Sequence, residues 1–561
     1  MDNVHHSFQK KYKQLVDLFF NRNADYWPCL ADPAFQKLIN FRKETYQESE
    51  AYREYPNAKE HLSSLKNLNT VPESIKLPDA SNCDDLLLFT AAFSKNWEDP
   101  SAVENVVTMA SDPAVYGSMM GLLANPNLVY SEYSGMSVEM ERALVRQIAS
   151  LAGYNPESAT GFFTQGGTFC NLYGYLIGIR KSLPEASHFG MGYTHDYRII
   201  NSQGGHYSNT TNLSLLGVNI KEKTIRIKVT ENNDIDLKDL RLQMESCFRL
   251  KCVIPTIMLT MGTTDTFGVD KVKEVFEIRE ELCQKYDMTV KPHIHVDSAI
   301  GWSMIFFLNY DFDSNPLDIN DVTLLGIQRN VSRFKEIRYA DSFTVDFQKW
   351  GYVPYTSSLV MFKNADDLEV LVNDPTNFTY FEKEAEGNTH LQYTIECSRG
   401  ASGMFGAYNS LKYLGVEGYQ TILAHCLQNA NYFRQRLQAQ KGVKVLAYQN
   451  QGPSVGFKLY DPSKVEDPDA EFDYEYNFNN SAEYEARVKE NLKFHRSTFL
   501  SRGKIGLYTN WVEFIARTDY DDKGNYRYIP GEKAVFMNPR TTRKEIDLFI
   551  DNLFGKPGDK K

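Results

Sequence analysis

Short apolar runs alternate with charged, amphipathic stretches between about residue 106 and residue 410. Residues 252–260, CVIPTIMLT, form one run, and residues 357–362, SSLVMF, form another. Residues 293–297, HIHVD, alternate apolar and polar positions and end on an acid. Runs of this length are typical of strands buried inside a sheet. Their alternation with helical patterns predicts a mainly parallel sheet flanked by helices.

The helical patterns carry recognisable ends. One helix is predicted to begin at Ser137, which suits the N-cap position, and to stop at Gly153. Its apolar residues recur every three or four positions: Met140, Leu144, Ile148 and Leu151. A second helix is predicted over residues 418–440, and residues 535–554 predict a strand, a turn and a closing helix.

These patterns divide the chain into three predicted parts. Residues 1–105 are charged and helix-like, residues 106–410 form the large domain, and residues 411–561 form a smaller C-terminal domain. The whole chain has 561 residues and is 42% hydrophobic, which suits a large globular enzyme rather than a disordered chain.

The net charge, the apolar stretches and the cysteine spacing indicate which partners and which location to expect. The formal net charge is −11 and no strong Lys/Arg cluster is present, so we expect no nucleic-acid partner. No stretch approaches the roughly eighteen consecutive apolar residues of a membrane span. The eight cysteines show no CxxC pair and no zinc spacing, and the N-terminus lacks the apolar stretch of a signal peptide. We therefore predict reduced thiols, no metal site and a cytoplasmic location.

A glycine pair follows one predicted strand and opens a helix within residues 162–181, FFTQGGTFCNLYGYLIGIRK. Gly166 and Gly167 allow close approach of an anion, the helix start offers free N–H groups, and Thr168 adds a hydroxyl. The segment is thus a candidate phosphate cradle. By itself it fits equally a Gly-Gly turn with Thr168 as a helix cap.

Three other residues indicate a cofactor site only when they are considered together with this cradle. Asp297 stands at the end of a predicted strand, where ligands bind in open α/β sheets, although Asp also suits a helix cap or a turn. His206 lies in a polar, glycine-rich loop, where a structural or merely exposed histidine is common. Lys349 stands between Phe347 and Trp350, either as a snorkelling lysine or as an amine nucleophile. A cofactor with a phosphate, an aromatic ring, a basic ring nitrogen and an aldehyde would use all four features, and pyridoxal 5'-phosphate has those parts.

Five motifs carry a resemblance to a known family. TQGGTFCN, GGHYSNTTNLSLLGV, MGTTDTFG, HIHVDSAIG and ADSFTVDFQKWGYVPY occur in that order within residues 110–410. They resemble the motifs of group II pyridoxal-phosphate-dependent amino-acid decarboxylases. The last motif, together with TIECSRGAS, is most similar to the bacterial tyrosine decarboxylase branch. The resemblance implies a fold-type I enzyme: a large, mostly parallel seven-stranded sheet domain with helices on both faces and a smaller C-terminal α/β domain.

The resemblance also assigns roles to the cofactor site. Lys349 would bind the cofactor aldehyde covalently, and we expect its partly desolvated amine to have a lowered pKa. Asp297 would keep the pyridine nitrogen protonated, and His206 would stack on the ring. Thr264 and Ala299 would line the ring. Further phosphate contacts are expected from Gly166, Gly167 and Thr168.

The chain departs from the family pattern at three positions. Gln348 replaces the usual histidine before the lysine; its amide can donate to a phosphate but cannot carry charge. Phe169 and Cys170 replace a common Glu-Ala pair in the cradle. These changes leave the cofactor assignment intact and affect the choice of substrate.

The resemblance implies a homodimer that decarboxylates an L-amino acid to its amine and CO₂. The substrate is expected to be aromatic, such as tyrosine; an acidic amino acid, a carbon–carbon lyase reaction and a site decayed to a binding role are the alternatives. Tyr380, in a predicted loop over residues 373–387, is the candidate proton donor, and Tyr130 a candidate substrate contact, although most tyrosines are packing residues. Arg399 would bind a substrate or cofactor anion, or else serve as an ion-pair partner.

Overall fold

The structure is a computed structural model that describes residues 6–19, 38–42, 51–69, 71, 85–129, 131–372 and 392–555. Tyr130 and Tyr380 lie outside these residues. The strands are β1 (Thr160–Thr164), β2 (Ile199–Ser202), β3 (Thr224–Ile227), β4 (Thr256–Thr260), β5 (His293–Asp297), β6 (Ser342–Asp346), β7 (Ser358–Phe362), β8 (Val443–Leu446), β9 (Ser454–Leu459), β10 (Asn510–Arg517) and β11 (Tyr528–Val535).

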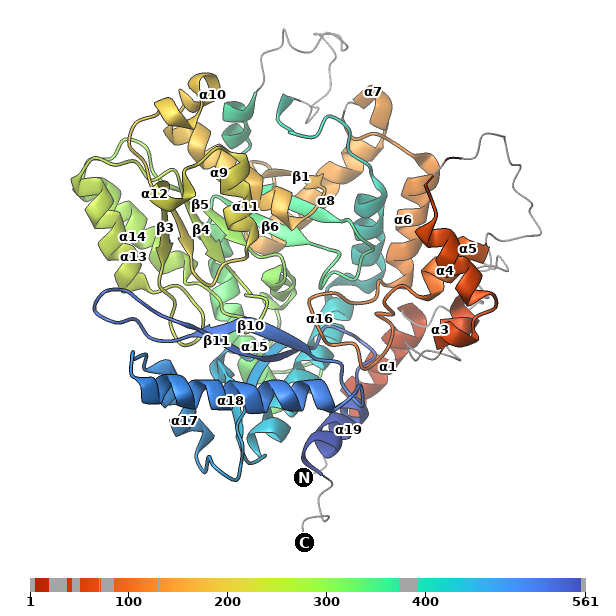
Figure 1. Cartoon of the computed structure of the whole chain (residues 1–561). Coiled ribbons are helices and arrows are strands. Elements are labelled where there is room, and N and C mark those ends of the chain that lie inside the picture. The colour runs from red at the N-terminus through yellow and green to blue at the C-terminus, as the bar shows by residue number, and fades with distance from the viewer. Residues whose placement is uncertain are drawn as a thin grey trace.

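Helices occupy much of the remaining described chain (Figure 1). Those before β3 are α1 (His6–Phe19), α3 (Ala51–Glu54), α4 (Ala58–Lys66), α5 (Asp85–Ala92), α6 (Asp112–Ala124), α7 (Ser131–Ser134), α8 (Ser137–Ala152), α9 (Gly167–Ser182), α10 (Ala186–Phe189), α11 (Ser208–Leu215) and α12 (Ile220–Lys223). Those after it are α13 (Leu237–Arg249), α14 (Val272–Lys285), α15 (Asp321–Phe334), α16 (Ser402–Gln438), α17 (Pro468–Tyr476), α18 (Ala482–Ser501) and α19 (Arg543–Phe554).

The large sheet has seven strands in the order β1-β7-β6-β5-β4-β2-β3. The pairs from β6 through β5, β4 and β2 to β3 are parallel, whereas β7 runs antiparallel to both β1 and β6. The predicted mostly parallel, seven-stranded sheet is therefore confirmed. Parallel strands end at the same edge of a sheet, so the loops that follow β2, β4, β5 and β6 gather on one side.

Helices cover both faces of this sheet, because its strands are apolar on both sides. Along β1, Phe163 points into the core shared with α8, while its neighbour Phe162 points into the core under α9. Along β4, Ile257 and Leu259 face the first side and Met258 the second. Successive residues of a strand face opposite sides, so an uninterrupted apolar run is the pattern of a doubly covered strand.

The smaller sheet is antiparallel, in the order β10-β11-β9-β8, and packs on α16 and α19. Its core contains Phe433, Phe457, Phe536 and Phe549, and Val103 from the chain before the large domain joins it. The boundary predicted at residue 410 falls inside α16, which breaks its helical geometry at Gly415. None of the helices in the described part of the chain is long and apolar enough to cross a membrane.

Three local predictions need correction. Met136, not Ser137, is the N-cap of α8, and Ser137 is the first helical residue; the predicted stop at Gly153 is right, with φ of +77°. The run from residue 252 becomes a strand only at Thr256, after Pro255, whose nitrogen has no hydrogen to donate to a ladder. The helix predicted from residue 418 is the second half of α16, which already begins at Ser402.

Candidate active site

A cavity of about 790 Å³ opens at the carboxyl ends of the large sheet, against the smaller sheet. The loops after β1, β2, β4, β5 and β6 line one side, and residues of β10 and β11 line the other. All the described residues that the sequence assigned to the cofactor line it: Gly166, Gly167, Thr168, His206, Thr264, Asp297, Ala299, Gln348 and Lys349. The tertiary structure thus gathers segments nearly two hundred residues apart into one cavity.

The glycine cradle lies between β1 and α9. Gly166 has φ of +142°, a conformation that residues with a side chain rarely adopt. A Cβ on Gly167 would stand 2.7 Å from Oδ2 of Asp346, so only glycine lets β6 approach the start of the helix this closely. The first N–H groups of α9 have no partner within the helix and face the cavity region, which suits an anion.

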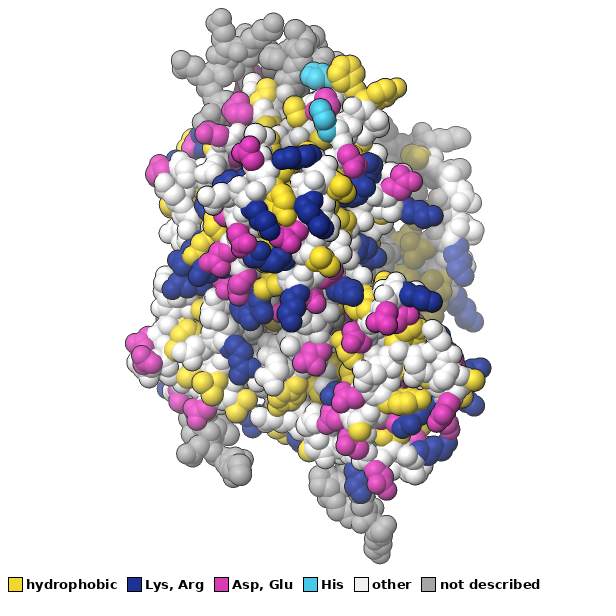
Figure 2. All heavy atoms as spheres, turned by 90° about the vertical axis from the view of Figure 1, so that its left-hand side faces the viewer, with side chains coloured by type: hydrophobic (Ala, Val, Ile, Leu, Met, Phe, Trp, Pro, Cys, Tyr) yellow, Lys and Arg dark blue, Asp and Glu magenta, His cyan; other side chains and the backbone are white. Residues whose placement is uncertain are grey.

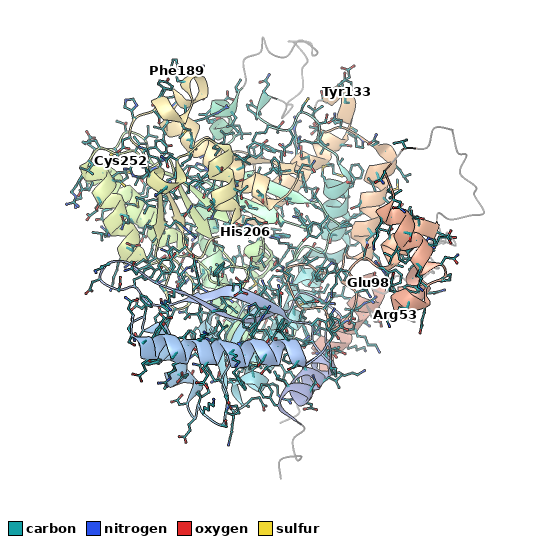
Figure 3. The ribbon with its side chains drawn as sticks, viewed as in Figure 1. Arg53, Glu98, Tyr133, Phe189, His206 and Cys252 are labelled. Carbon is teal, nitrogen blue, oxygen red and sulfur yellow. The ribbon has the colours of Figure 1, made fainter. Side chains whose placement is uncertain are left out.

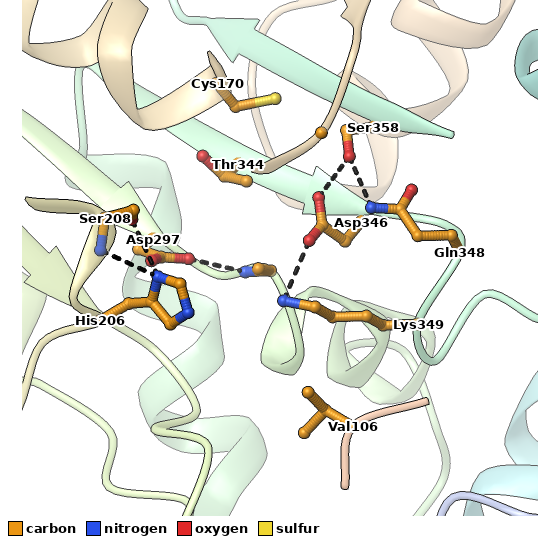
Figure 4. Close-up of polar contacts among 12 residues, drawn as sticks. Val106, Cys170, His206, Ser208, Asp297, Thr344, Asp346, Gln348, Lys349 and Ser358 are labelled. Carbon is orange, nitrogen blue, oxygen red and sulfur yellow. Dashed lines mark hydrogen bonds and ion pairs between the residues drawn. The ribbon is translucent and has the colours of Figure 1, made fainter. Parts of the chain in front are cut away.

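Asp297, at the end of β5, is buried, and a residue of α9 holds it by a hydrogen bond. Its Oδ2 accepts a hydrogen bond of 2.8 Å from Nδ2 of Asn171 on α9, and its Oδ1 accepts one from the Ala299 backbone N–H. The side-chain oxygen of Asn171 in turn accepts from Thr344 Oγ1 at 2.8 Å, which fixes the orientation of the amide. Asp297 therefore presents a carboxylate in a set direction, as Figure 4 shows.

His206, in the loop after β2, is neutral in this environment. Its Nδ1 accepts a hydrogen bond of 3.2 Å from the backbone N–H of Ser208, so the ring proton lies on Nε2. Burial lowers the pKa of His206, and this effect outweighs the nearby carboxylate of Asp297, which raises it, while Lys349 lowers it. A neutral imidazole that lines the cavity can stack on a flat, electron-poor ring.

Lys349 lies in the loop between β6 and β7 and pairs with a buried acid. Its Nζ stands 3.0 Å from Oδ2 of Asp346, whose Oδ1 accepts a hydrogen bond of 2.6 Å from Ser358. Burial alone would lower the pKa of Lys349, but the carboxylates of Asp346 and Asp297 outweigh it and raise that pKa. The expectation of a lowered pKa was therefore wrong for the chain by itself: the amine is an ammonium ion in a carboxylate pair.

Gln348 takes part in the same network. Its Nε2 donates to Ser358 Oγ at 2.7 Å, and its Oε1 accepts from the Ser357 backbone N–H at 2.8 Å. Both ends of the amide thus hold the start of β7 beside Asp346 (Figure 4). This fixes the loop that carries Lys349, a role that the residue pattern did not suggest.

Arg399 occupies a different place from the cofactor residues. Its guanidinium donates to both carboxylate oxygens of Glu141, at 2.7 and 3.2 Å, and to the backbone oxygens of Phe163 and Leu128. Both side chains of the pair are buried, and Arg399 is not among the described residues that line the cavity. These contacts favour the ion-pair alternative.

Sequence reasoning missed Lys533, a buried cation on β11 that lines the cavity from the smaller domain. Its Nζ lies 2.6 Å from Oδ1 of Asp265, in the loop after β4, and 3.4 Å from Oδ1 of Asn105. The sequence gives little signal for Lys533, because it follows Gly531 and Glu532 in a polar stretch before the apolar end of the strand. Asn171 and Asp346 were also missed, because a short polar residue inside a motif fits many local roles.

Comparisons with known proteins agree with this geometry. A family model described as the pyridoxal-dependent decarboxylase conserved domain matches residues 81–460. An aspartate 1-decarboxylase of Aliivibrio fischeri is 24% identical over 355 residues, covering 59% of this chain and 58% of that protein. An L-tyrosine decarboxylase of Enterococcus faecium is 24% identical over 391 residues, covering 58% of this chain and 62% of that protein. The chain thus spans about three fifths of the length of these relatives.

Solved structures share the fold at low sequence identity. The crystal structure of mouse CSAD has a TM-score of 0.68 and 16% identity, covering 94% of this chain and 98% of that one. The crystal structure of Oryza sativa TDC with PLP and tryptamine has a TM-score of 0.68 and 13% identity, covering 95% and 98%. The α/β architecture with a large, mostly parallel sheet is therefore that of pyridoxal-phosphate decarboxylases.

Proposed function

Because this chain belongs to the pyridoxal-dependent decarboxylase family, we propose that it releases CO₂ from an L-amino acid and forms the matching amine. One observation carries the proposal. Lys349, Asp297 and His206 line a single cavity with the N-terminus of α9. These groups match an aldehyde, a ring nitrogen, a ring face and a phosphate, so the residues present fit pyridoxal 5'-phosphate.

Each residue has a definable task once the cofactor is bound. The cofactor supplies a ring that withdraws electrons from the carbon that loses its carboxyl group. Lys349 would attach the cofactor through its amine. Asp297, which the Asn171 hydrogen bond keeps in position, would hold a proton at the ring nitrogen. His206 would stack on the ring, and the first N–H groups of α9 would hold the phosphate.

Lys533 is the residue that we propose to bind the substrate carboxylate. It is a buried cation on the side of the cavity opposite the sheet loops, and Asp265 already holds its amine in position. A fixed cation there would orient the carboxylate before it leaves. Arg226 and Arg517 also line the cavity and add to its positive lining.

Two substrate classes have support. The cavity lining includes Tyr207, Tyr355, Phe514 and Tyr528, and these rings favour the aromatic substrate that we propose, such as tyrosine. Lys533, Arg226 and Arg517 favour an acidic amino acid as the second candidate, because a second carboxylate needs a second positive partner. Relatives named for both substrate classes are similar to this chain.

A dimer would explain the exposed aromatic rings at the cavity. Tyr207 and Tyr355 line it, yet 77% and 56% of their surfaces are exposed in the single chain. We therefore propose a cytoplasmic homodimer in which a second copy covers these rings. The described cysteines are free thiols, which suits that compartment. Light scattering of the loaded protein at micromolar concentration should give twice the mass of 64.4 kDa.

The test of the proposed function is a screen of the purified, pyridoxal-phosphate-loaded protein against the protein amino acids by mass spectrometry. Each reaction is examined for loss of CO₂ and gain of the matching amine. An amine from an aromatic substrate supports the main proposal, and one from aspartate or glutamate supports the second. Cleavage to an aldehyde without CO₂ release would move the chain to the lyases, and no turnover of any of these amino acids would overturn the proposal.

Asp346→Asn is expected to shift the pH at which the cofactor attaches to Lys349. Attachment needs the neutral amine. Burial lowers the pKa of Lys349, but the Asp346 carboxylate raises it, and the net shift is upward. The wild type should therefore load more readily as the pH rises. Removal of the carboxylate should move the loading midpoint downward by roughly one to two pH units.

The visible absorbance of the bound cofactor, followed from pH 6 to pH 10, measures this midpoint. Ser358→Ala is the matched control, since it removes a hydrogen bond to Asp346 and leaves the charge in place. The control should keep a midpoint close to that of the wild type. A variant Asp346→Asn with an unmoved midpoint would contradict the electrostatic account.

A further inference from the structure

Two cysteines far from the active site meet at the end of α13. In Figure 3, Cys252 lies at the edge of the large domain, whereas His206 marks the central cavity. Cys247 is in the last turn of the helix, and Cys252 follows its end. They are 6% and 3% exposed, so both lie just below the surface.

The way in which α13 ends brings these two side chains together. Lys251 has φ of +56°, its N–H donates to the Phe248 oxygen at 3.0 Å, and the Cys252 N–H donates to the Cys247 oxygen at 3.0 Å. This pair of bonds is the Schellman motif, in which the third residue before the helix cap contacts the second residue after it. Here both contacting positions are cysteines.

The backbone geometry suits a covalent link. A direct backbone hydrogen bond between Cys247 and Cys252 keeps their Cα atoms at a separation that a disulfide, which spans about 4.4–6.8 Å, can bridge. Their neighbours Leu250 and Lys251 are exposed, so a small reagent reaches the turn from solvent.

The electrostatic surroundings favour a thiolate at this site. Nη1 of Arg198 stands 4.0 Å from Sγ of Cys252. The hydrogen bond from the Cys252 thiol lowers the pKa of Cys247 against the effect of burial, and Arg198 lowers it further, whereas the Cys247 partner and burial raise the pKa of Cys252. The reactive species in thiol–disulfide exchange is the thiolate.

On the face that carries α13 and α14, basic and acidic side chains are interspersed (Figure 2), as in the pairs Arg241–Glu281 and Lys285–Glu245.

We propose that Cys247 and Cys252 form a redox-active dithiol that closes to a disulfide by exchange with a low-molecular-weight disulfide such as oxidised glutathione. The Cys247 thiolate attacks one glutathione sulfur, forms a mixed disulfide and releases one glutathione thiolate, which takes up a proton. The Cys252 thiol then loses its proton and attacks the Cys247 sulfur, and the second glutathione leaves as a thiolate that takes up a proton. Two protein thiols are oxidised, and one glutathione disulfide is reduced to two thiols.

The site is connected to two of the loops that line the cofactor cavity on the side of the large sheet. Val253 exchanges backbone hydrogen bonds with Asp196 and Arg198, which lead into β2 and the His206 loop. The same segment continues into β4 and the loop that carries Thr264. The dithiol is nevertheless a site of its own, because neither cysteine is among the described residues that line the cavity.

Tryptic peptide mapping of the loaded, full-length protein tests the proposal. The protein is incubated with oxidised glutathione, and remaining thiols are blocked with N-ethylmaleimide in denaturant. Trypsin cleaves after Arg249 and Lys251, between the two cysteines, so a disulfide joins the peptides 242–249 and 252–271. We expect the joined peptides from most wild-type chains, and their separation when a reductant is added before digestion.

Variants separate the pair from general cysteine oxidation. Cys283→Ser is the matched control, because Cys283 on the adjacent α14 is also 3% exposed. It should leave the joined peptides unchanged, whereas Cys247→Ser should abolish them. In Cys252→Ser, Cys247 should retain glutathione as a stable mixed disulfide. If wild-type chains instead show both cysteines blocked by maleimide, or each bound separately to glutathione, the proposal is overturned.

Discussion

Lys349→Ala is expected to lower the rate of CO₂ release by at least about a thousandfold. The amine is the only described lysine in the loop between β6 and β7, and it pairs with Asp346 in the cavity that Asp297 and His206 also line. Without it the cofactor has no covalent anchor. Cofactor should therefore leave the variant on dialysis and remain with the wild type.

The intact mass gives this result independently of the rate. After reduction with borohydride, the intact mass of the wild type should include the cofactor, and that of Lys349→Ala should not. Lys363→Ala serves as the control, because Lys363 follows β7 outside the cavity and donates to the Arg338 backbone oxygen. Retention of reducible cofactor by Lys349→Ala would show that another residue anchors it.

Asp297→Asn is expected to lower the turnover of loaded enzyme on the order of a hundredfold to a thousandfold. The change keeps the shape of the side chain and leaves an oxygen that can accept from Asn171. It removes the charge that we propose to hold a proton at the ring nitrogen, so the ring should withdraw electrons less strongly. Cofactor attachment through Lys349 should persist, which separates this effect from the loss of the cofactor.

Asn171→Ala provides the graded comparison. It removes the 2.8 Å bond to Asp297 but leaves the carboxylate and its second hydrogen bond from Ala299. Its turnover should fall less than that of Asp297→Asn. Steady-state rates and the absorbance of the bound cofactor, measured on the same samples, check both expectations. Equal turnover of Asp297→Asn and wild type would remove Asp297 from the mechanism.

Local sequence patterns predicted the parts of the fold that depend on near neighbours. HIHVD is β5 without a shift of either end, and Gly153 ends α8 as predicted. The glycine pair opens α9 because a positive φ and the missing Cβ are local requirements. The run beginning at Cys252 showed the limit, since Pro255 delays the strand and the preceding residues close a helix instead.

The order of motifs also predicted that residues from distant parts of the chain meet at one edge of the sheet. Gly166, His206, Asp297 and Lys349 are far apart in the chain, yet all line the same cavity. This succeeded because parallel strands deliver their carboxyl ends to one edge of a sheet, so residues at successive strand ends converge. The division into three parts and the roles of Tyr130 and Tyr380 stay predictions.

The sequence by itself determined which residues stand at the strand ends, because period and glycine placement act over a few residues. Only the tertiary structure decided their electrostatic state. Asp346 and Asp297 together raise the pKa of Lys349, and Glu141 engages Arg399 from a helix more than two hundred residues away. Lys533 reaches the cavity from the smaller domain. Charge interactions depend on distances in space, and sequence periodicity carries no information about those distances.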